Sequence, residues 1–273
     1  MTPSPIVEEW TMLNEEEAPG RAPTRIQSVA KAARFLALIA GSPGVEWKAR
    51  SMAKELGTSL PGVYHLANTL SDAGLISVDE SGRYTLGIAV GRLASAYYEQ
   101  SVPPPELLVP LKNLARETGE TSYLSDWRNG DMEIIAEVPG TRPHRVVDLG
   151  VGFHGMAHAR ASGKVLLAFG THEQRERYID SIPLQQTTVR TITDPDVLRQ
   201  ELRAVHDQGY GAEYGELLDG IGCLSVPVID DGLLFGAYTV SAPLTRIEAE
   251  NETYLKALKD AASVAGKAIR RSR

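Results

Sequence analysis

The sequence predicts an α+β protein with an N-terminal winged helix-turn-helix and a C-terminal antiparallel sheet with flanking helices. Three features predict this fold class: a helix, turn, helix and hairpin pattern in residues 46–86, three consecutive prolines at 103–105, and strand signals joined by short turns beyond them. A length of 273 residues fits two domains of ordinary size. We assign residues 1–22 to a disordered tail, 23–86 to the winged helix-turn-helix, 87–104 to a linker helix and 105–273 to the C-terminal domain.

The N-terminal region begins with a segment rich in Pro, Glu and Ala that lacks periodicity, which is typical of disorder. The first helix is predicted to start near Thr24, which has capping-box spacing to Gln27, and to end at Gly41. The second predicted helix is Glu46–Leu56, whose apolar residues follow helical spacing. Gly57 can end this helix, because glycine enters the left-handed region without steric cost.

The third predicted helix follows after a tight turn. Ser59 can cap it, and Pro61 is tolerated in its first turn. Leu75–Val78 and Arg83–Leu86 then form two short strands around a four-residue turn. The inward stripe of the helix is Val63, Leu66, Ala67 and Leu70. Together these elements describe a winged helix-turn-helix, a shape that places one helix in a DNA major groove and a hairpin beside it.

The outward face of this third helix supplies candidate DNA-contacting residues. Asn68 can pair in bidentate fashion with adenine, and Tyr64 or Ser59 can hold a phosphate. Arg83 in the hairpin can reach a minor groove or a phosphate. We expect DNA contacts from Ser59, Pro61, Gly62, Tyr64, His65, Asn68 and Arg83. The alternative is that the same positions form a solvated face of a winged-helix protein interface.

The rest of the chain alternates helix and strand signals. A helix is predicted for Gly87–Ser101, before the prolines that mark the best domain boundary. Strands joined by hairpins with helices at the start and end favour an α+β sandwich. The predicted helices are Glu106–Glu117, Ala161–Phe169, Glu173–Ile179, Asp196–Gln208 and Glu248–Arg270, and the predicted strands are Thr121–Trp127, Glu133–Val138, Arg145–Leu149, Leu224–Ile229 and Leu233–Ser241.

The composition is that of an ordinary soluble globular protein, with 42% hydrophobic and 23% charged residues. No apolar run is long enough for a membrane span, and the N-terminus lacks the pattern of a secretory signal. Cys223 is the only cysteine, so no intrachain disulfide can form. These features predict a cytoplasmic protein without a membrane partner.

The charge distribution singles out one segment. The net charge is −7, which argues against DNA binding over the whole surface. Residues 21–101 hold nine Lys and Arg against six Asp and Glu, a local charge of +3, whereas residues 1–20 and 102–273 each carry −5. The only positive segment therefore contains the predicted DNA-binding module, but its excess is small.

Four motifs resemble those of the IclR family of bacterial transcriptional regulators and follow one another in the same order as in that family. They are Arg83–Gly87 after the winged helix, Ala159–Phe169, the pair Gly209–Glu216 and Gly220–Val228, and Tyr238–Pro243. The resemblance covers roughly residues 24–271 and implies a GAF-like effector-binding domain at the C-terminus. It also implies a homodimer built largely on the N-terminal domain, often paired into a tetramer. Members of the family bind operator DNA and small metabolites, frequently organic acids, and repress or activate neighbouring genes.

The resemblance places an effector site in the C-terminal domain. The start of the helix after Ala161 offers free N–H groups that suit a carboxylate. Thr239 and Ser241 share one face of a strand. A carboxylate at Glu213 repels an anion unless it is protonated or the ligand offers a donor, so we expect an effector with both donor and acceptor groups. By family position the site residues are Ala161, Ser162, Glu213, Cys223, Thr239 and Ser241, with Tyr123, Trp127, Met156 and His158 as candidates for its wall.

Structural roles compete with some of these assignments. Ser162 can simply cap a helix, and Thr239 and Ser241 can be ordinary strand residues. The sequence also departs from the family at Leu60–His65, where basic residues are usual, and at Glu213, where aspartate is common. These departures leave the base contacts and the ligand open.

Two other classes of function compete with the regulator. An adaptor that binds a ligand without binding DNA is one. A hydrolase using Cys223 with His154, His158 or His206 is the other, although no local signature supports it. The His154–His158 spacing can chelate a metal on a helix, but Gly155 stands where metalloproteases carry glutamate. We expect a ligand-responsive regulator that is not an enzyme and needs no cofactor or metal.

Overall fold

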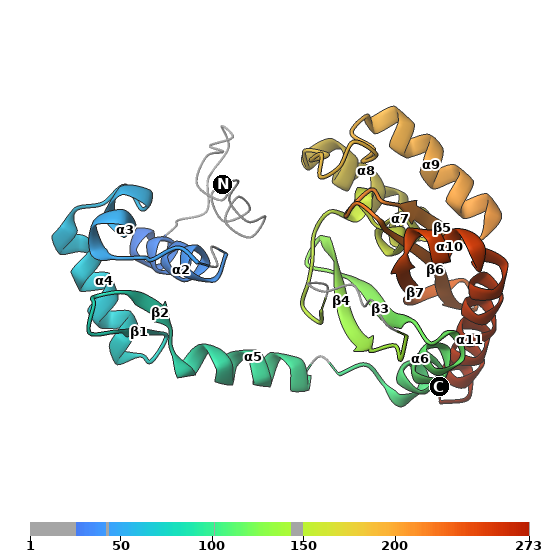
Figure 1. The fold of residues 1–273 in the computed structure, drawn as a ribbon, viewed down its shortest axis with the longest axis horizontal. Helices are drawn as coiled ribbons and strands as arrows, with labels where there is room; N and C mark the ends of the chain where they lie inside the picture. Colours follow the sequence, from blue (N-terminus) through green and yellow to red (C-terminus); the bar gives the residue numbers. More distant parts are fainter. Residues whose placement is uncertain (1–25, 42–43, 101, 143–149, 273) are drawn as a thin grey trace. The chain divides into compact units, whose positions relative to one another are not determined.

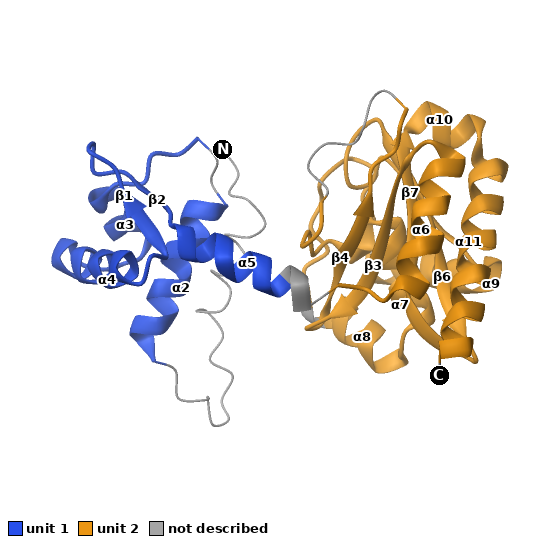
Figure 2. Ribbon diagram, turned by 90° about the horizontal axis from the view of Figure 1, so that it is seen from below, with its two compact units in different colours: residues 1–101 blue, residues 102–273 orange. Residues whose placement is uncertain are grey.

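The computed structural model describes residues 26–41, 44–100, 102–142 and 150–272. The chain divides into two compact units, Met1–Ser101 and Val102–Arg273 (Figure 2). The predicted tail 1–22, the capping position Thr24 and the predicted strand Arg145–Leu149 lie outside the described residues.

The N-terminal unit is a winged helix-turn-helix followed by one further helix (Figure 1). Its core is formed by buried residues of all three helices and the hairpin, including Phe35, Met52 and Val63, which are fully buried. The Phe35 and Tyr84 rings meet edge to face at 5.1 Å, which ties the first helix to the hairpin. In chain order the elements are α2 (Gln27–Ala40), α3 (Ala49–Glu55), α4 (Leu60–Asp72), β1 (Ile76–Val78), β2 (Tyr84–Leu86) and α5 (Ile88–Gln100).

Helix α4 starts as its cap predicts. The Gly62 N–H donates to Ser59 Oγ at 3.2 Å, and Pro61 lies in the first turn, where its missing N–H costs nothing. Gly57 has a φ of 56°, which separates α3 from α4 with a left-handed turn.

Helix α3 begins three residues later than the predicted Glu46. The reason lies at Trp47, whose indole is buried and whose carbonyl oxygen accepts the Tyr84 N–H at 2.8 Å. Trp47 therefore pairs with the hairpin and not with the helix, and Lys48 occupies the capping position before the first helical turn. Helical spacing of apolar residues cannot separate these two roles.

The base of the hairpin fixes the start of α5. The Gly87 N–H donates to the Leu75 carbonyl and the Ala89 N–H donates to the Gly74 carbonyl, both at 2.9 Å. A Cβ atom at position 87 would overlap the Gly74 carbonyl group. Only glycine lets the two backbones approach this closely, so α5 leaves the winged helix in one fixed direction.

The C-terminal unit is a five-stranded antiparallel sheet in the order β4-β3-β7-β6-β5. Helices α6 and α11 cover one face, and α7 lies on the other with α9 packed against it (Figure 1). The strands are β3 (Thr121–Arg128), β4 (Asp131–Val138), β5 (Gly211–Tyr214), β6 (Ile221–Asp230) and β7 (Leu233–Pro243), and the helices are α6 (Pro105–Thr118), η1 (Ala157–Ala159), α7 (Ala161–Phe169), α8 (His172–Ser181), α9 (Pro195–Gln208), α10 (Leu244–Ala249) and α11 (Asn251–Ser272).

Two details differ from the predicted elements. Strand β5 was not predicted, because it has four residues between a helix and a Gly-rich turn. The predicted helix Glu248–Arg270 is instead two helices that break at Glu250, whose N–H ends α10 on the Arg246 carbonyl. The Glu250 carboxylate pairs with Arg142, and this pairing gives the break a structural role.

We predict that Gly87→Ala destabilises the N-terminal unit by about 1–3 kcal/mol, because the new methyl group forces apart the hairpin and the start of α5. Gly91→Ala is the matched control, since no atom lies within 4 Å of its added Cβ and alanine favours a helix by up to about 1 kcal/mol. Hydrogen exchange of the β1 and β2 amides measures both effects. Equal protection in the two variants would contradict the close approach at Gly87.

Candidate functional sites

The sheet of the C-terminal unit has one apolar face and one polar face. Residues such as Leu124, Leu224 and Val240 point to the core under α6 and α11. Their neighbours in sequence point the other way, toward α7, because successive side chains of a strand alternate between faces. On this second face lie Tyr123, Ser125, Cys223, Ser225, Thr239 and Ser241, all buried. Polar side chains gathered on a buried face indicate a binding site rather than a core.

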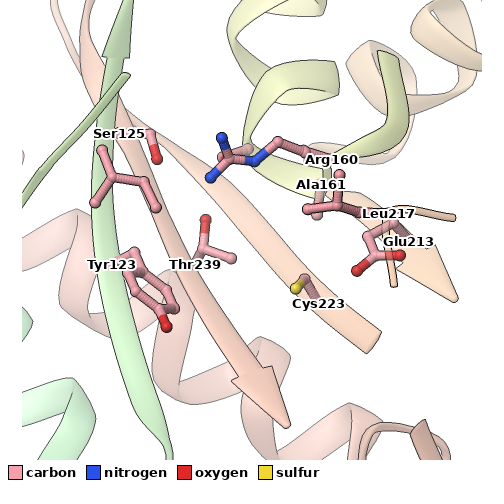
Figure 3. A pocket seen from close by; sticks show the side chains of 10 residues that line it. Tyr123, Ser125, Arg160, Ala161, Glu213, Leu217, Cys223 and Thr239 are labelled. Atoms are coloured by element: carbon pink, nitrogen blue, oxygen red, sulfur yellow. The ribbon is translucent and has the colours of Figure 1, made fainter. Parts of the chain in front are cut away.

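A pocket lies between this polar face and the start of α7 (Figure 3). The space in it is about 320 Å³, a figure that includes its opening to solvent. It is lined by Tyr123, Ser125, Ile134, Arg160, Ala161, Ser162, Glu213, Leu217, Cys223 and Thr239.

Five of the six predicted effector residues line this pocket, namely Ala161, Ser162, Glu213, Cys223 and Thr239. The sixth, Ser241, stands behind Cys223 and accepts its S–H at 3.3 Å. Thr239 Oγ1 donates to Ser225 Oγ at 3.0 Å, which leaves its lone pairs as acceptors toward the pocket.

The N-terminus of α7 forms one wall of the pocket. Arg160 occupies the capping position with extended backbone, and no side chain caps the helix. The first-turn N–H groups therefore carry the positive end of the helix dipole toward the pocket side. Ser162 is not a cap. It lies inside the first turn, and its hydroxyl faces Met132 Sδ at 3.8 Å.

The Arg160 side chain extends into the pocket toward Ser125 and Thr239 (Figure 3). The residue is only 5% exposed, and its Nη1 atom has no hydrogen-bond partner among the described residues. Its Cζ atom lies 4.7 Å from the centroid of the Phe153 ring, a cation–π contact. Burial lowers the pKa of the guanidinium to about 10, so it remains charged at neutral pH.

Glu213 lies on another side of the pocket, next to Cys223 (Figure 3). Its Oε2 atom accepts the Glu216 N–H at 2.8 Å. Burial raises the pKa of its carboxyl group from 4.5 to about 6, against the lowering effect of that N–H. The Glu216 carboxylate is in turn bound by Lys164 Nζ at 2.7 Å. Glu213 is therefore a carboxylate that changes charge close to physiological pH.

Cys223 has the environment of a structural thiol rather than a nucleophile. Burial raises the pKa of its thiol well above the usual value. The nearby Glu213 carboxyl group raises this pKa further, and the hydrogen bond to the Ser241 hydroxyl offsets these effects only in part. The geometry gives no support to a Cys-dependent hydrolase.

The histidines considered for metal binding do not share a helix. His154 lies in a bridge to Glu133, and His158 lies in the short helix η1. His158 contacts the Tyr178 hydroxyl at 2.7 Å and the Gln185 carbonyl at 3.0 Å. Within the described ranges, no group of three His, Cys, Asp or Glu side chains could hold a metal ion. Of the wall candidates Tyr123, Trp127, Met156 and His158, only Tyr123 lines the pocket.

The second candidate site is the outward face of α4. Val63, Ala67 and Leu70 are buried and Leu66 is half-buried, which matches the predicted inward stripe. Pro61, Tyr64, His65 and Asn68 are exposed on the other side, as are Ser59 before the helix and Arg83 in the hairpin, while Gly62 is half-buried. Arg83 lies 3.7 Å from Asp79 in an exposed ion pair that leaves it available to other partners.

A comparison with known families decides the class of the chain. A profile described as bacterial transcriptional regulator IclR C-terminal matches residues 106–265. The chain belongs to the IclR family. The predicted family and the α+β fold class are both confirmed.

Individual IclR relatives are identical to this chain at slightly more than a quarter of the aligned positions. The glycerol operon regulatory protein of Streptomyces coelicolor is 29% identical over 229 residues, which cover 83% of this chain and 89% of that protein. The HTH-type transcriptional regulator KdgR of Dickeya chrysanthemi is 26% identical over 192 residues, which cover 70% of this chain but only 63% of that protein. Both relatives are regulatory proteins.

A solved IclR homologue from Microbacterium hydrocarbonoxydans has the same fold, with a TM-score of 0.69 and 21% identity. The match covers 89% of this chain and 99% of that one, and that homologue is complexed with 4-hydroxybenzoate.

In the part of the present chain that is described, no helix has the length and apolarity to cross a membrane.

Sequence reasoning missed four residues of the pocket. Ser125 had a usable signal, because strict alternation with buried Leu124 puts it on the polar face. Arg160 lies within the Ala159–Phe169 motif, but only the fold shows that its side chain turns inward. Ile134 and Leu217 are ordinary apolar residues, whose position in the wall has no sequence signature.

We predict a pH-dependent stability effect of Glu213. Its pKa is raised on folding, so the native state takes up the proton more readily than the unfolded state, and stability falls as pH rises from about 4.5 through 6. The loss is about 2 kcal/mol. Relative to the wild type, Glu213→Gln should therefore gain about this much stability between pH 4 and pH 7.5, measured by urea unfolding.

Glu248→Gln is the control, because Glu248 is an exposed carboxyl of the same unit. Its stability difference from the wild type should change little over this range. A Glu213→Gln difference that is equally flat would show that the buried carboxyl does not titrate there.

Proposed function

We propose that this protein is a ligand-responsive transcriptional regulator that binds operator DNA as a dimer or tetramer and holds a small organic acid in its C-terminal unit. The observation that carries the proposal is the exposed polar face of α4 beside the hairpin, in a chain of the IclR family. A buried pocket in a separate unit supplies the place where a signal can enter.

The DNA contact proposed here depends little on charge. Helix α4 contains no Lys or Arg, so its exposed residues can offer hydroxyl, imidazole and amide groups but no permanent cation. In this proposal Asn68 reads an adenine edge, and Tyr64 and Ser59 hold phosphates. Other basic residues of this unit, such as Lys48, Arg50 and Lys54, are exposed and can add phosphate contacts.

We predict that the double variant Tyr64→Ala, Asn68→Ala weakens binding to DNA from upstream of its own gene at least tenfold, since one bidentate base pair contact is worth about 1–3 kcal/mol. Gel-shift titration measures this effect. Asp72→Asn is the control, because Asp72 lies on the same helix outside the predicted contact set.

The same titrations at several salt concentrations test the weak role of charge. The slope of log K against log salt should be well below ten, because each neutralised phosphate adds about 0.9. If the wild-type protein binds no DNA near its gene even at low salt, the proposal gives way to a ligand-binding adaptor.

Self-association is supported by apolar side chains that the N-terminal unit leaves exposed. Val29 on α2 and Leu93 on α5 are each 63% exposed, and Ile88 is 72% exposed. Apolar side chains that gather in one exposed patch mark a protein interface. We place the dimer contact on α2 and α5, and paired dimers would give the tetramer.

We predict that Leu93→Glu shifts the protein toward the mass of one chain in sedimentation, because a carboxylate is costly in an apolar interface. Val189→Glu is the control, as Val189 lies in a loop of the C-terminal unit and is 88% exposed. A Leu93→Glu protein with the wild-type mass would remove α5 from the interface.

An organic acid is supported by the uncapped start of α7, which faces the pocket with its positive end. The homologue complexed with 4-hydroxybenzoate adds a family precedent. We propose that the dimer has two arrangements that differ in DNA affinity. The effector can change DNA affinity only as far as the effector binds one of these arrangements more tightly than the other. We propose that α5 and the residues after it carry this change to the winged helices.

A further inference from the structure

The pocket contains two ionisable groups that its own fold leaves in different states. Arg160 is a buried cation whose Nη1 atom lacks a partner among the described residues. Glu213 is a buried carboxyl group that accepts the Glu216 N–H and lies beside the Cys223 thiol. The end of the pocket at Arg160 therefore needs a hydrogen-bond acceptor from a ligand, and the end at Glu213 can accept a hydrogen bond from it.

A neighbouring lysine shows that the fold can satisfy a buried cation. Lys164 lies one helical turn after Arg160 and is 1% exposed. Its Nζ atom donates to Glu216 at 2.7 Å, to Glu201 at 3.0 Å and to the Ala212 carbonyl at 3.2 Å. All three of its protons have acceptors, as a buried ammonium requires.

Arg160 differs from Lys164 in this respect. A buried guanidinium with an open donor is unfavourable by itself, because its lost hydration is not replaced. The cation–π contact with Phe153 and the nearby carboxyl groups of Asp131 and Glu213 compensate only part of this loss, since none of them is a hydrogen-bond acceptor for Nη1. Ser125 Oγ also lacks a hydrogen-bond partner among the described residues, and it lines the same pocket. An acceptor placed between them would satisfy both groups.

The missing acceptor is most simply a carboxylate. Its two oxygens match the planar fork of a guanidinium, and its charge balances that of Arg160. The uncapped N–H groups at the start of α7 add to the same anionic preference, since Arg160 is the residue at which this helix begins.

The opposite side of the pocket prefers a hydroxyl group. Glu213 has a pKa of about 6, so it is present in both charge states near neutral pH. A hydroxyl can donate to the ionised carboxylate and accept from the protonated acid, whereas an ammonium suits only the ionised form. An ammonium would also need several acceptors at once, and among the described residues that line the pocket Glu213 is the only carboxylate. Ile134 and Leu217 supply an apolar middle section.

We propose that the effector is a small hydroxycarboxylic acid, with its carboxylate on Arg160 and Ser125 and its hydroxyl on Glu213. This inference rests on the effector pocket proposed above and names its two specificity-determining side chains. The apolar part of the ligand lies between its two polar groups. The loss of affinity on removing the carboxylate should therefore depend on Arg160, and the loss on removing the hydroxyl should depend on Glu213.

The test uses the full-length protein and two matched sets of compounds, one aromatic and one aliphatic. The aromatic set is 4-hydroxybenzoate, benzoate, 4-aminobenzoate and 4-hydroxybenzamide, and the aliphatic set is 4-hydroxybutanoate, butanoate, 4-aminobutanoate and 4-hydroxybutanamide. Isothermal titration calorimetry gives each Kd. In at least one set, the hydroxy acid should bind roughly tenfold to a hundredfold more tightly than the compound lacking either group, as expected for hydrogen bonds to charged partners.

Variants then assign each preference to one residue. Arg160→Gln should abolish the preference for the acid over the amide and keep the preference for the hydroxyl. Glu213→Leu, whose side chain cannot form a hydrogen bond, should do the reverse. Arg116→Gln, an exposed arginine of α6 on the other side of the sheet, should change neither. The wild-type comparison needs no variant, so it decides the ligand class even if one variant fails to fold.

Several results would overturn the inference. The first is equal binding of the hydroxy acid and its amide, and the second is equal binding of the acids with and without the hydroxyl. The others are tighter binding of the amino-substituted acid than of the hydroxy acid, and no binding of any compound in either set. A gel shift on the same preparation separates this from the proposed function. If DNA binds and the acids do not, only the ligand class falls. If the acids bind as expected and no DNA binds, the regulator proposal falls and the ligand class stands.

Discussion

The alternation of side chains along β3, β6 and β7 is the constraint on which the C-terminal unit depends. Antiparallel pairing holds the three strands in one register, with Ser225 opposite Thr239 and Cys223 opposite Ser241. Each strand must therefore present one face to α6 and α11 and the other to α7. The apolar face drives folding, and the polar face is placed with the same accuracy by the same ladder. A slip of one residue would put leucines into the pocket and hydroxyls into the core.

The packing of α7 onto this polar face follows from a few small residues. A Cβ at Gly211 would lie 2.7 Å from the Ala161 carbonyl oxygen, so β5 approaches the first turn of the helix as closely as a backbone can. Gly163 allows an equally close backbone approach between α7 and η1. The helix start is thus held rigidly, and with it both Arg160 and Lys164. One of these cations is fully compensated by the fold and the other is not, a local violation of the rules for buried charge that natural proteins reserve for functional sites.

Much of this architecture follows from local sequence rules, and the exceptions have physical reasons. The turn and the start of α4 are predicted by Gly57, Ser59 and Pro61. The spacing of apolar residues predicts that Val63 and Leu70 are buried in the core of the N-terminal unit. Helix α7 matches its predicted bounds because its run of apolar residues is bounded by Arg160 and Gly170. Trp47 was misassigned since an extended residue that packs on a hairpin looks apolar in either state. Arg160 was missed because burial of a charged side chain is decided by the fold, and no local pattern encodes it.

The fixed junction at Gly87 has a mechanical consequence. Since hydrogen bonds to Gly74 and Leu75 join α5 to the hairpin, the helix and the winged helix form one lever rather than two hinged parts. Thirteen residues of helix give this lever a length of about 20 Å. A turn of about 10° at its far end then moves its near end by about 3.4 Å, the rise of one base step in DNA. A rigid glycine contact would in this way convert a small angular change into a different register on the double helix.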